Sequence, residues 1–292
     1  MTSAPPMAPP MATPMATPMI SHAPIHCADG TACQLFGPDA APSPSRPPLI
    51  LIHGLGLNQA MWREQTPALS QDRQIITYDL YGHGDSPAPP EPPSLALFAR
   101  QFAGVMTHFD LPHAIIAGFS LGGMIVRRIA MDMPHLVSGL AILNSPHART
   151  KAEQDAIQAR VYQAAAAGPG ATIDAALERW FTPGFHAANP AVMQDVRDWV
   201  LANDPQIYPA IYQVLVDGVA ELVAPSPPIA APCLVLTGDE DYGNNPAMSA
   251  AIAAEIAGAS LVILPGLRHM AMCEAPDIFN HHLAQFCATI AR

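Results

Sequence analysis

The sequence predicts an α/β protein in which a doubly wound, mostly parallel sheet carries an inserted helical cap. Two observations support this fold class. Short apolar runs alternate with helical patterns between about residues 23 and 149, and two further apolar runs follow a stretch with helical periodicity alone. A chain of 292 residues with 50% hydrophobic content can bury one large core that carries an inserted subdomain. We therefore expect a core at 23–149 and 222–292 and a helical cap at 150–221.

The expected strands are short aliphatic runs. Four of them, at 49–52, 74–78, 113–117 and 140–143, lack two-fold alternation, as is typical of strands covered on both faces. Two more follow later in the chain, at 233–237 and 261–264. Residues 150–221 contain no such run, and their apolar side chains recur with helical spacing at Ile173, Ala176, Leu177, Trp180 and Phe181 and again at Val192, Val196, Trp199 and Val200. Asn189 is the expected N-cap of the second helix, with Pro190 at its first position. Pro276 begins a closing helix that packs back on the core.

Composition and charge limit the classes of partner. The 24 acidic residues outnumber the 13 lysines and arginines, and the net charge is −11, which excludes the basic surface of a nucleic-acid-binding protein. We expect a small-molecule substrate and no cofactor. No spacing of histidines and carboxylates resembles a zinc site, so no metal is expected. No pattern indicates an oligomeric state.

The start of the chain and its cysteines bear on the cellular compartment. Residues 1–22 repeat Met, Ala, Thr and Pro, which predicts a disordered tail. This segment lacks the basic and apolar regions of a secretory signal, and no apolar run reaches the roughly 18 residues of a membrane-spanning helix. Five cysteines without a Cys-x-x-Cys pair favour reduced core thiols, although Cys27 and Cys33 could face each other across an early hairpin. We expect a cytoplasmic protein without a membrane partner.

The motif that carries the chemistry joins an apolar strand to a helical pattern through Gly118-Phe119-Ser120-Leu121-Gly122. A Gly-x-Ser-x-Gly sequence in this context is a nucleophile elbow, a sharp turn that holds the serine in a strained backbone conformation. Only small residues fit two positions before and two positions after the serine. The turn places the hydroxyl at the start of a helix, whose unpaired N–H groups and dipole favour a developing oxyanion. Ser120 is therefore the predicted nucleophile.

A serine hydroxyl needs a base that a carboxylate orients, and after an elbow of this kind the acid precedes the histidine along the chain. Of the six histidines that follow Ser120, only His269 lies in a short loop just after a strand. Three carboxylates follow the strand at 233–237. Asp241 is favoured as the acid because the loop must extend beyond the strand before a side chain can turn back toward the histidine, and Asp239 is the next choice.

The loop His53-Gly54-Leu55-Gly56 follows the first of the expected parallel strands. Its glycines let the backbone pass close to the elbow, so that the N–H groups of Leu55 and Leu121 form the predicted oxyanion hole. We interpret His53 as a structural hydrogen-bonding group rather than a second base. The same interpretation applies to His83, which lies in a loop turn.

These motifs together resemble those of the α/β-hydrolase superfamily over nearly all of residues 24–290. Within it, residues 144–149 (Asn-Ser-Pro-His-Ala-Arg) and 178–185 (Glu-Arg-Trp-Phe-Thr-Pro-Gly-Phe) are most similar to the corresponding stretches of the 3-oxoadipate enol-lactonase group. The resemblance implies an α/β-hydrolase fold, a helical cap over the active site, and a small ester or enol lactone as substrate.

The predicted function is a serine esterase or lactonase that forms an acyl-enzyme on Ser120. Arg149 is a candidate anchor for a carboxylated substrate, and Trp180 a candidate pocket residue; a surface ion pair and simple packing are their alternative roles. The same triad also serves hydrolysis of carbon–carbon or amide-type bonds, and it is compatible with acyl transfer or haloperoxidase-like activity. The alternative from another class is a non-catalytic, hydrolase-like ligand-binding protein.

Overall fold

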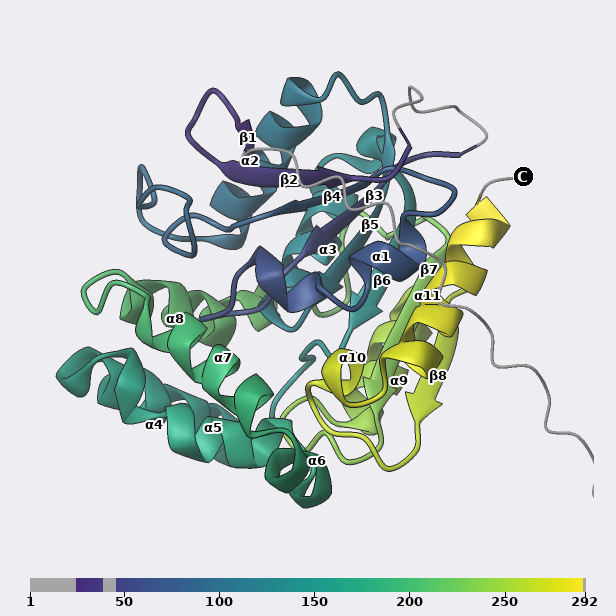
Figure 1. The fold of residues 1–292 in the computed structure, drawn as a ribbon. Helices are drawn as coiled ribbons and strands as arrows, with labels where there is room; N and C mark the ends of the chain where they lie inside the picture. Colours follow the sequence, from purple (N-terminus) through teal and green to yellow (C-terminus); the bar gives the residue numbers. More distant parts are fainter. Residues whose placement is uncertain (1–24, 39–45, 291–292) are drawn as a thin grey trace, which may run out of the picture.

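The computed structural model describes residues 25–38 and 46–290, and within them one eight-stranded sheet forms the centre of the molecule (Figure 1). Its strands are β1 (Ile25–His26), β2 (Ala32–Phe36), β3 (Leu49–Ile52), β4 (Ile75–Tyr78), β5 (Ala114–Phe119), β6 (Val137–Leu143), β7 (Cys233–Gly238) and β8 (Ser260–Leu264). Their order across the sheet is β1-β2-β4-β3-β5-β6-β7-β8. The expected tail at residues 1–22 lies outside the described residues.

The sheet is mostly parallel, as the sequence predicts. Strands β3 to β8 all pair in parallel, whereas β2 pairs antiparallel with both β1 and β4. Every residue of β3, β4, β5 and β7 is buried, which explains why their sequences show no two-fold alternation. Each of the six expected runs is a strand, and β6 begins at Val137 rather than at residue 140.

The antiparallel edge formed by β1 and β2 is not among the expected strands. These two strands form the early hairpin that the cysteine spacing allows, because Cys27 and Cys33 lie side by side with their Sγ atoms 3.6 Å apart. Both residues are free thiols, as are the other three cysteines. The expectation of reduced thiols agrees with this arrangement.

Helices cover both faces of the sheet. One face packs against α2 (Leu95–His108), α3 (Leu121–Asp132) and α9 (Pro246–Glu255), and the other packs against α1 (Thr66–Leu69), α10 (Ala271–Glu274) and α11 (Pro276–Ile290). Ser94 immediately precedes α2, and its side chain caps the helix by accepting a hydrogen bond from the Leu97 N–H. Short 3-10 helices lie at Gln59–Trp62, Pro134–Leu136, Pro169–Ala171 and Gly218–Glu221.

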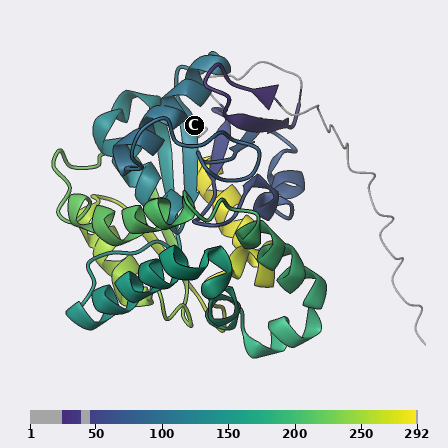
Figure 2. The ribbon, with the colours of Figure 1, turned by 90° about the vertical axis from the view of Figure 1, so that its left-hand side faces the viewer.

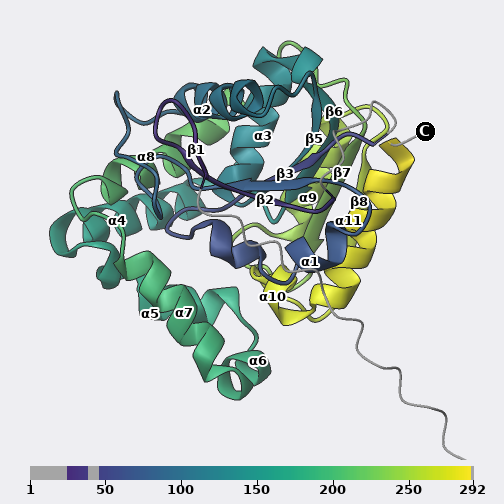
Figure 3. The ribbon, with the colours of Figure 1, turned by 45° about the horizontal axis from the view of Figure 1, so that its top comes forward.

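Residues 150–221 form a helical segment that lies across the edge where the parallel strands end (Figure 1; Figure 2). Its helices are α4 (Lys151–Ala167), α5 (Ile173–Trp180), α6 (Pro183–Ala188), α7 (Pro190–Leu201) and α8 (Tyr208–Asp217). Apolar residues of α4 and α8 join the core on the α2 and α3 face, whereas those of α5 and α7 join the core on the opposite face (Figure 3). Among all helices of the described residues, none is both long and apolar enough to cross a bilayer.

One expected detail of this segment is wrong. Asn189 does precede α7, but its side chain does not cap that helix, because its Nδ2 atom instead donates to the Phe185 carbonyl oxygen at 3.0 Å. The short helix α6 ends immediately before Asn189, and its last carbonyl groups compete for the amide. The Pro190 position is as predicted.

The two connections of the helical segment meet at one buried arginine. Arg127 on α3 donates to the carbonyl oxygen of Pro146, where the chain leaves the sheet, and to that of Leu222, where it returns. Glu255 lies 3.5 Å from the same guanidinium group. Since a buried guanidinium needs partners for its N–H groups, these bonds tie both ends of the segment to the helix that follows Ser120.

Candidate active site

Ser120 lies in the sharp turn between β5 and α3, at φ 55° and ψ −111°. A positive φ is costly for a residue with a side chain, so the surrounding structure must hold it there. The two glycines of the motif are required sterically. A Cβ atom on Gly118 would lie 2.1 Å from the Gly122 carbonyl oxygen, and one on Gly122 would lie 2.4 Å from the Ile52 carbonyl oxygen.

Hydrogen bonds on either side hold this turn in place. The Ser120 N–H donates to the Leu143 carbonyl oxygen at 2.9 Å, which ties the end of β5 to the end of β6. The Ser145 hydroxyl donates to the Ser120 carbonyl oxygen at 3.0 Å. The strained conformation is therefore fixed from the neighbouring strand, and the Ser120 side chain is left free to face the cavity described below.

His269 and Asp241 form a buried pair. The Nδ1 atom of His269 lies 2.7 Å from Oδ2 of Asp241, whose side chain is 1% exposed. The same carboxylate accepts hydrogen bonds from the N–H groups of Gly243 and Asn244 and from the side-chain amide of Asn144. With the histidine, four donors surround the carboxylate, and these bonds fix it in the position from which it orients the imidazole.

The two other carboxylates of this loop point elsewhere. Asp239 accepts a hydrogen bond from the Gly266 N–H at 2.6 Å, and Glu240 lies 3.5 Å from the Arg268 guanidinium. Of the three acids weighed from the sequence, only Asp241 contacts His269. Asp239 instead fixes the turn that carries the histidine loop.

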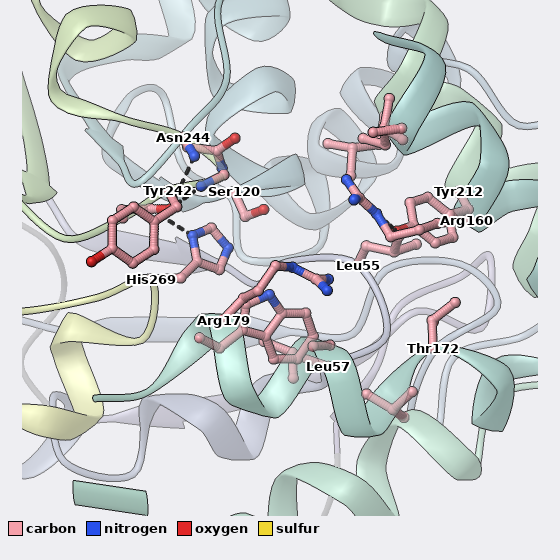
Figure 4. A pocket seen from close by; sticks show the side chains of 18 of the residues that line it. Leu55, Leu57, Ser120, Arg160, Thr172, Arg179, Tyr212, Tyr242, Asn244 and His269 are labelled. Atoms are coloured by element: carbon pink, nitrogen blue, oxygen red, sulfur yellow. Dashed lines mark hydrogen bonds and ion pairs between the residues drawn. The ribbon is translucent and has the colours of Figure 1, made fainter. Parts of the chain in front are cut away.

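Ser120 and His269 face the same cavity without a direct hydrogen bond between them (Figure 4). The His269 ring packs between Phe119, with ring centres 4.7 Å apart, and Trp180, with ring centres 6.0 Å apart. The Met270 N–H donates to the Trp180 carbonyl oxygen at 2.9 Å, which joins the histidine loop to α5. In ligand-free enzymes the bond between nucleophile and base is often long and shortens only when substrate binds.

The N–H groups of Leu55 and Leu121 have no hydrogen-bond partner within the described part of the chain. Leu121 is the first residue of α3, where an N–H group has no intrahelical acceptor. Leu55 lines the cavity beside Ser120. Both donors therefore remain available to an oxyanion.

Two buried histidines hold the loop that carries Leu55. His53 accepts a hydrogen bond from the Leu80 N–H at 2.9 Å, and His83 accepts one from the Gly56 N–H at 3.0 Å, each through Nε2. Burial lowers the pKa of His53 to about 4 and that of His83 to about 3, so both rings are neutral acceptors at neutral pH. The structural role expected for His53 is confirmed, and His83 supports the neighbouring residue of the same loop.

The cavity in front of Ser120 has a volume of about 240 Å³. Core residues line one side and the helical segment lines the other, with both Arg149 and Trp180 among the lining residues. Sequence reasoning missed Arg160 and Arg179, which also line the cavity. The sequence offered no signal for them, because Glu153, seven residues before Arg160 on α4, is recognised as a lining residue only in the structure. Within the described residues no group of three His, Cys, Asp or Glu side chains is arranged to hold a metal ion.

Comparisons with known proteins are consistent with this geometry. A sequence profile described as alpha/beta hydrolase fold matches residues 47–276. The chain is 27% identical over 236 residues to 3-oxoadipate enol-lactonase 2 of Acinetobacter baylyi, covering 81% of this chain and 86% of that protein. It is also 27% identical to the (E)-2-((N-methylformamido)methylene)succinate hydrolase of the same organism, covering 83% and 90%. The solved enol-lactonase from Burkholderia xenovorans LB400 aligns with a TM-score of 0.80 at 28% identity, covering 88% of this chain and 97% of that one.

Proposed function

This chain belongs to the alpha/beta hydrolase fold family, and from that premise we propose that it is a serine hydrolase that cleaves a small carboxylic ester or enol lactone. The observation that carries the proposal is the buried His269–Asp241 pair, which faces the same cavity as the strained Ser120. The enol-lactonases among the similar proteins favour an ester or lactone bond. The small cavity favours a compact substrate.

In the proposed first step, the Asp241 carboxylate accepts a hydrogen bond from the Nδ1–H group of His269. This bond fixes the tautomer in which the Nε2 lone pair is free to take the Ser120 proton. The Ser120 Oγ atom then forms a bond to the carbonyl carbon. The carbonyl oxygen becomes an oxyanion, which the N–H groups of Leu55 and Leu121 stabilise. The protonated His269 is stabilised in turn by the ionised Asp241.

In the second step the carbon–oxygen bond to the leaving group breaks, and His269 returns its proton to that oxygen. An ester releases an alcohol, whereas a lactone ring opens and its alcohol or enol stays attached to the acyl group. Water, deprotonated by His269, then attacks the acyl-enzyme and frees Ser120. The net reaction consumes one water molecule and yields a carboxylate.

The test is hydrolysis of short p-nitrophenyl esters and small lactones by the wild type beside Ser120→Ala. We expect turnover by the wild type and almost none by the variant, with thermal unfolding unchanged because the substitution removes one oxygen from a cavity wall. Retained activity in the variant would contradict the proposed nucleophile. A folded wild type with no turnover on any member of the panel would favour a ligand-binding protein.

A second candidate keeps the site and changes the bond. The succinate hydrolase of Acinetobacter baylyi is as similar in sequence as the enol-lactonase, and its name indicates an N-methylformamido substrate. An amide-type bond would be cleaved by the same three side chains, with His269 protonating a leaving nitrogen rather than oxygen. Mass spectrometry of the products from paired ester and amide substrates distinguishes the two, since only the second function releases the amine.

A further inference from the structure

Three arginine side chains line the cavity, and all come from the helical segment or its entrance. Arg149 precedes α4, Arg160 lies on α4 and Arg179 lies on α5. Figure 4 shows Arg160 and Arg179 reaching into the cavity that Ser120 and His269 also face. The cavity that Ser120 faces is therefore lined by three arginines.

None of these three arginines forms an ion pair with a carboxylate among the described residues. Arginines outside the cavity behave differently, because seven of them form such pairs: Arg63, Arg73, Arg100, Arg127, Arg128, Arg197 and Arg268. The remaining described arginine, Arg46, is exposed and donates to a carbonyl oxygen. Acids outnumber basic residues 24 to 13 in this chain, so carboxylate partners are abundant. Unpaired arginines are therefore concentrated where a substrate binds.

The two carboxylates that line the cavity are already engaged. Glu153 accepts hydrogen bonds from the Thr150 N–H at 2.7 Å and from its hydroxyl at 2.9 Å, forming the capping box of α4. Asp241 is paired with His269. Glu153 offsets one of the three arginine charges, and Asp241 offsets the imidazolium that His269 becomes during the reaction. Two positive charges remain for a ligand.

The arginines also keep hydrogen-bond donors free. Arg149 uses Nη1 for the Leu215 carbonyl oxygen, Arg160 uses Nε for the Tyr212 hydroxyl, and Arg179 uses Nη1 for the Ala175 carbonyl oxygen. Each guanidinium has five N–H groups, so both terminal nitrogens of Arg160 and one of Arg179 have no protein partner within the described chain. A carboxylate is the planar acceptor that such a fork of donors binds in bidentate fashion.

The positive charges of the three arginines also repel one another, which favours an anion in the cavity. Burial and, to a smaller extent, the nearby Arg160 together lower the pKa of Arg149 to about 10. The same two causes lower the pKa of Arg179. The three guanidinium groups carry like charges and lie around one partly buried cavity. An anion between them removes this repulsion.

We propose that the substrate is a small dianion, which carries two carboxylates in addition to the bond that is cleaved, and that Arg160 and Arg179 bind those carboxylates. Arg149, whose guanidinium also donates to carbonyl oxygens of α8, adds a third positive charge to the same cavity. The inference rests on the proposed hydrolase function, because it assigns the substrate class of that same cavity.

The test compares three p-nitrophenyl esters that share the reactive group: the propionate, the hemisuccinate and the monoester of tricarballylic acid, with zero, one and two free carboxylates. We expect kcat/KM to increase with each carboxylate. Arg160→Gln and Arg179→Gln should each lower kcat/KM for the dianionic ester by about tenfold to a hundredfold, mainly through KM, with a far smaller loss for the propionate. Arg179→Lys should recover part of the loss, because it restores charge without the fork.

The matched control is Arg197→Gln on α7, which removes an arginine of the same helical segment that is paired with Asp174 outside the cavity. It should change no ester's kinetics. Equal kcat/KM on the three esters, or an equal loss on all of them in the arginine variants, would refute the dianion while leaving the hydrolase intact. Absence of turnover on every ester would contradict the ester hydrolase, whereas the dianion is tested independently by binding. Calorimetry of tricarballylate binding to Ser120→Ala separates these cases, since we expect binding that Arg160→Gln weakens and Arg197→Gln does not.

Discussion

The two walls of the cavity differ in how far their polar groups are already satisfied. On the core side, Asp241 has four hydrogen-bond donors, and the histidines beneath Leu55 each have a fixed partner. On the side of the helical segment, the guanidinium groups of Arg160 and Arg179 have free donors and no ion pair. The difference indicates that the sheet supplies a preorganised reaction centre and the helical segment supplies substrate recognition.

Asp241→Asn is the substitution with the largest expected effect on the reaction centre that the sheet supplies. The amide cannot fix the His269 tautomer, because it presents a donor where the histidine needs an acceptor, and we expect kcat to fall by about ten-thousandfold. Steady-state kinetics on a neutral ester measure the change. A loss of less than tenfold would show that the buried pair is structural and that another group activates Ser120.

A smaller effect is expected on the other wall from Arg149→Ala. The guanidinium lines the cavity, and its loss should raise KM about tenfold for an ester that carries a carboxylate, with kcat nearly unchanged. A neutral ester of equal length is the comparison. If KM rises equally for both esters, Arg149 holds the α8 backbone rather than the substrate.

The smallest expected effect concerns the pH dependence of stability on the core side. In the folded protein the pKa of His53 is lowered from 6.5 to about 4 and that of His83 from 6.5 to about 3. Between pH 6.5 and these lowered values, the unfolded chain binds more protons than the folded one. The free energy of unfolding therefore falls as the pH drops below about 6.5. Burial raises the pKa of Asp79 from 3.8 to about 6, which acts in the opposite direction between pH 6 and 3.8. The two histidines outweigh the single aspartate, so we expect a net decrease in the free energy of unfolding as the pH falls toward 4.

Urea denaturation at a series of pH values from 7 to 4.5 measures this slope. Asp79→Asn removes the opposing titration, so its free energy of unfolding should fall more steeply with decreasing pH than that of the wild type. The slope is the informative quantity, because the variant replaces one carboxylate oxygen by a donor and so also loses the hydrogen bonds that Oδ2 accepts from the Gln59 side chain and the Asp85 N–H. Equal slopes in the two proteins would contradict the raised pKa of Asp79.

The central strands and the elbow were predictable because their signals are local. A strand covered on both faces must be apolar throughout, and the turn at Ser120 tolerates only glycine at residues 118 and 122. The loop of Asp241 follows β7, which is buried throughout, and the loop of His269 follows β8, an edge strand that is largely exposed but is still a short apolar run. The positions of both loops could therefore be inferred from chain order. The hairpin of β1 and β2 was not predicted, because its strands contain no continuous apolar run. Strand β1 has only two residues, and the last three residues of β2 are exposed or partly exposed.

The side of the cavity formed by the helical segment was harder to predict, because its lining depends on how α4 and α5 lie relative to each other and to the core. Arg149 and Trp180 were chosen by their place in the sequence, whereas Arg160 and Arg179 become neighbours only when α4 and α5 both face the cavity. Asn189 shows the same limit at short range: the residue precedes a helix as expected, but its side chain bonds backward to α6. Side-chain partners set by the packing of two helices leave no signature in either helix alone.

The most direct test of the proposed chemistry is labelling with a fluorophosphonate, followed by intact-mass measurement and peptide mapping. We expect one adduct per chain on wild type, located at Ser120, and none on Ser120→Ala at equal folding. Labelling of another residue, or equal labelling of the two proteins, would contradict an activated serine at the elbow.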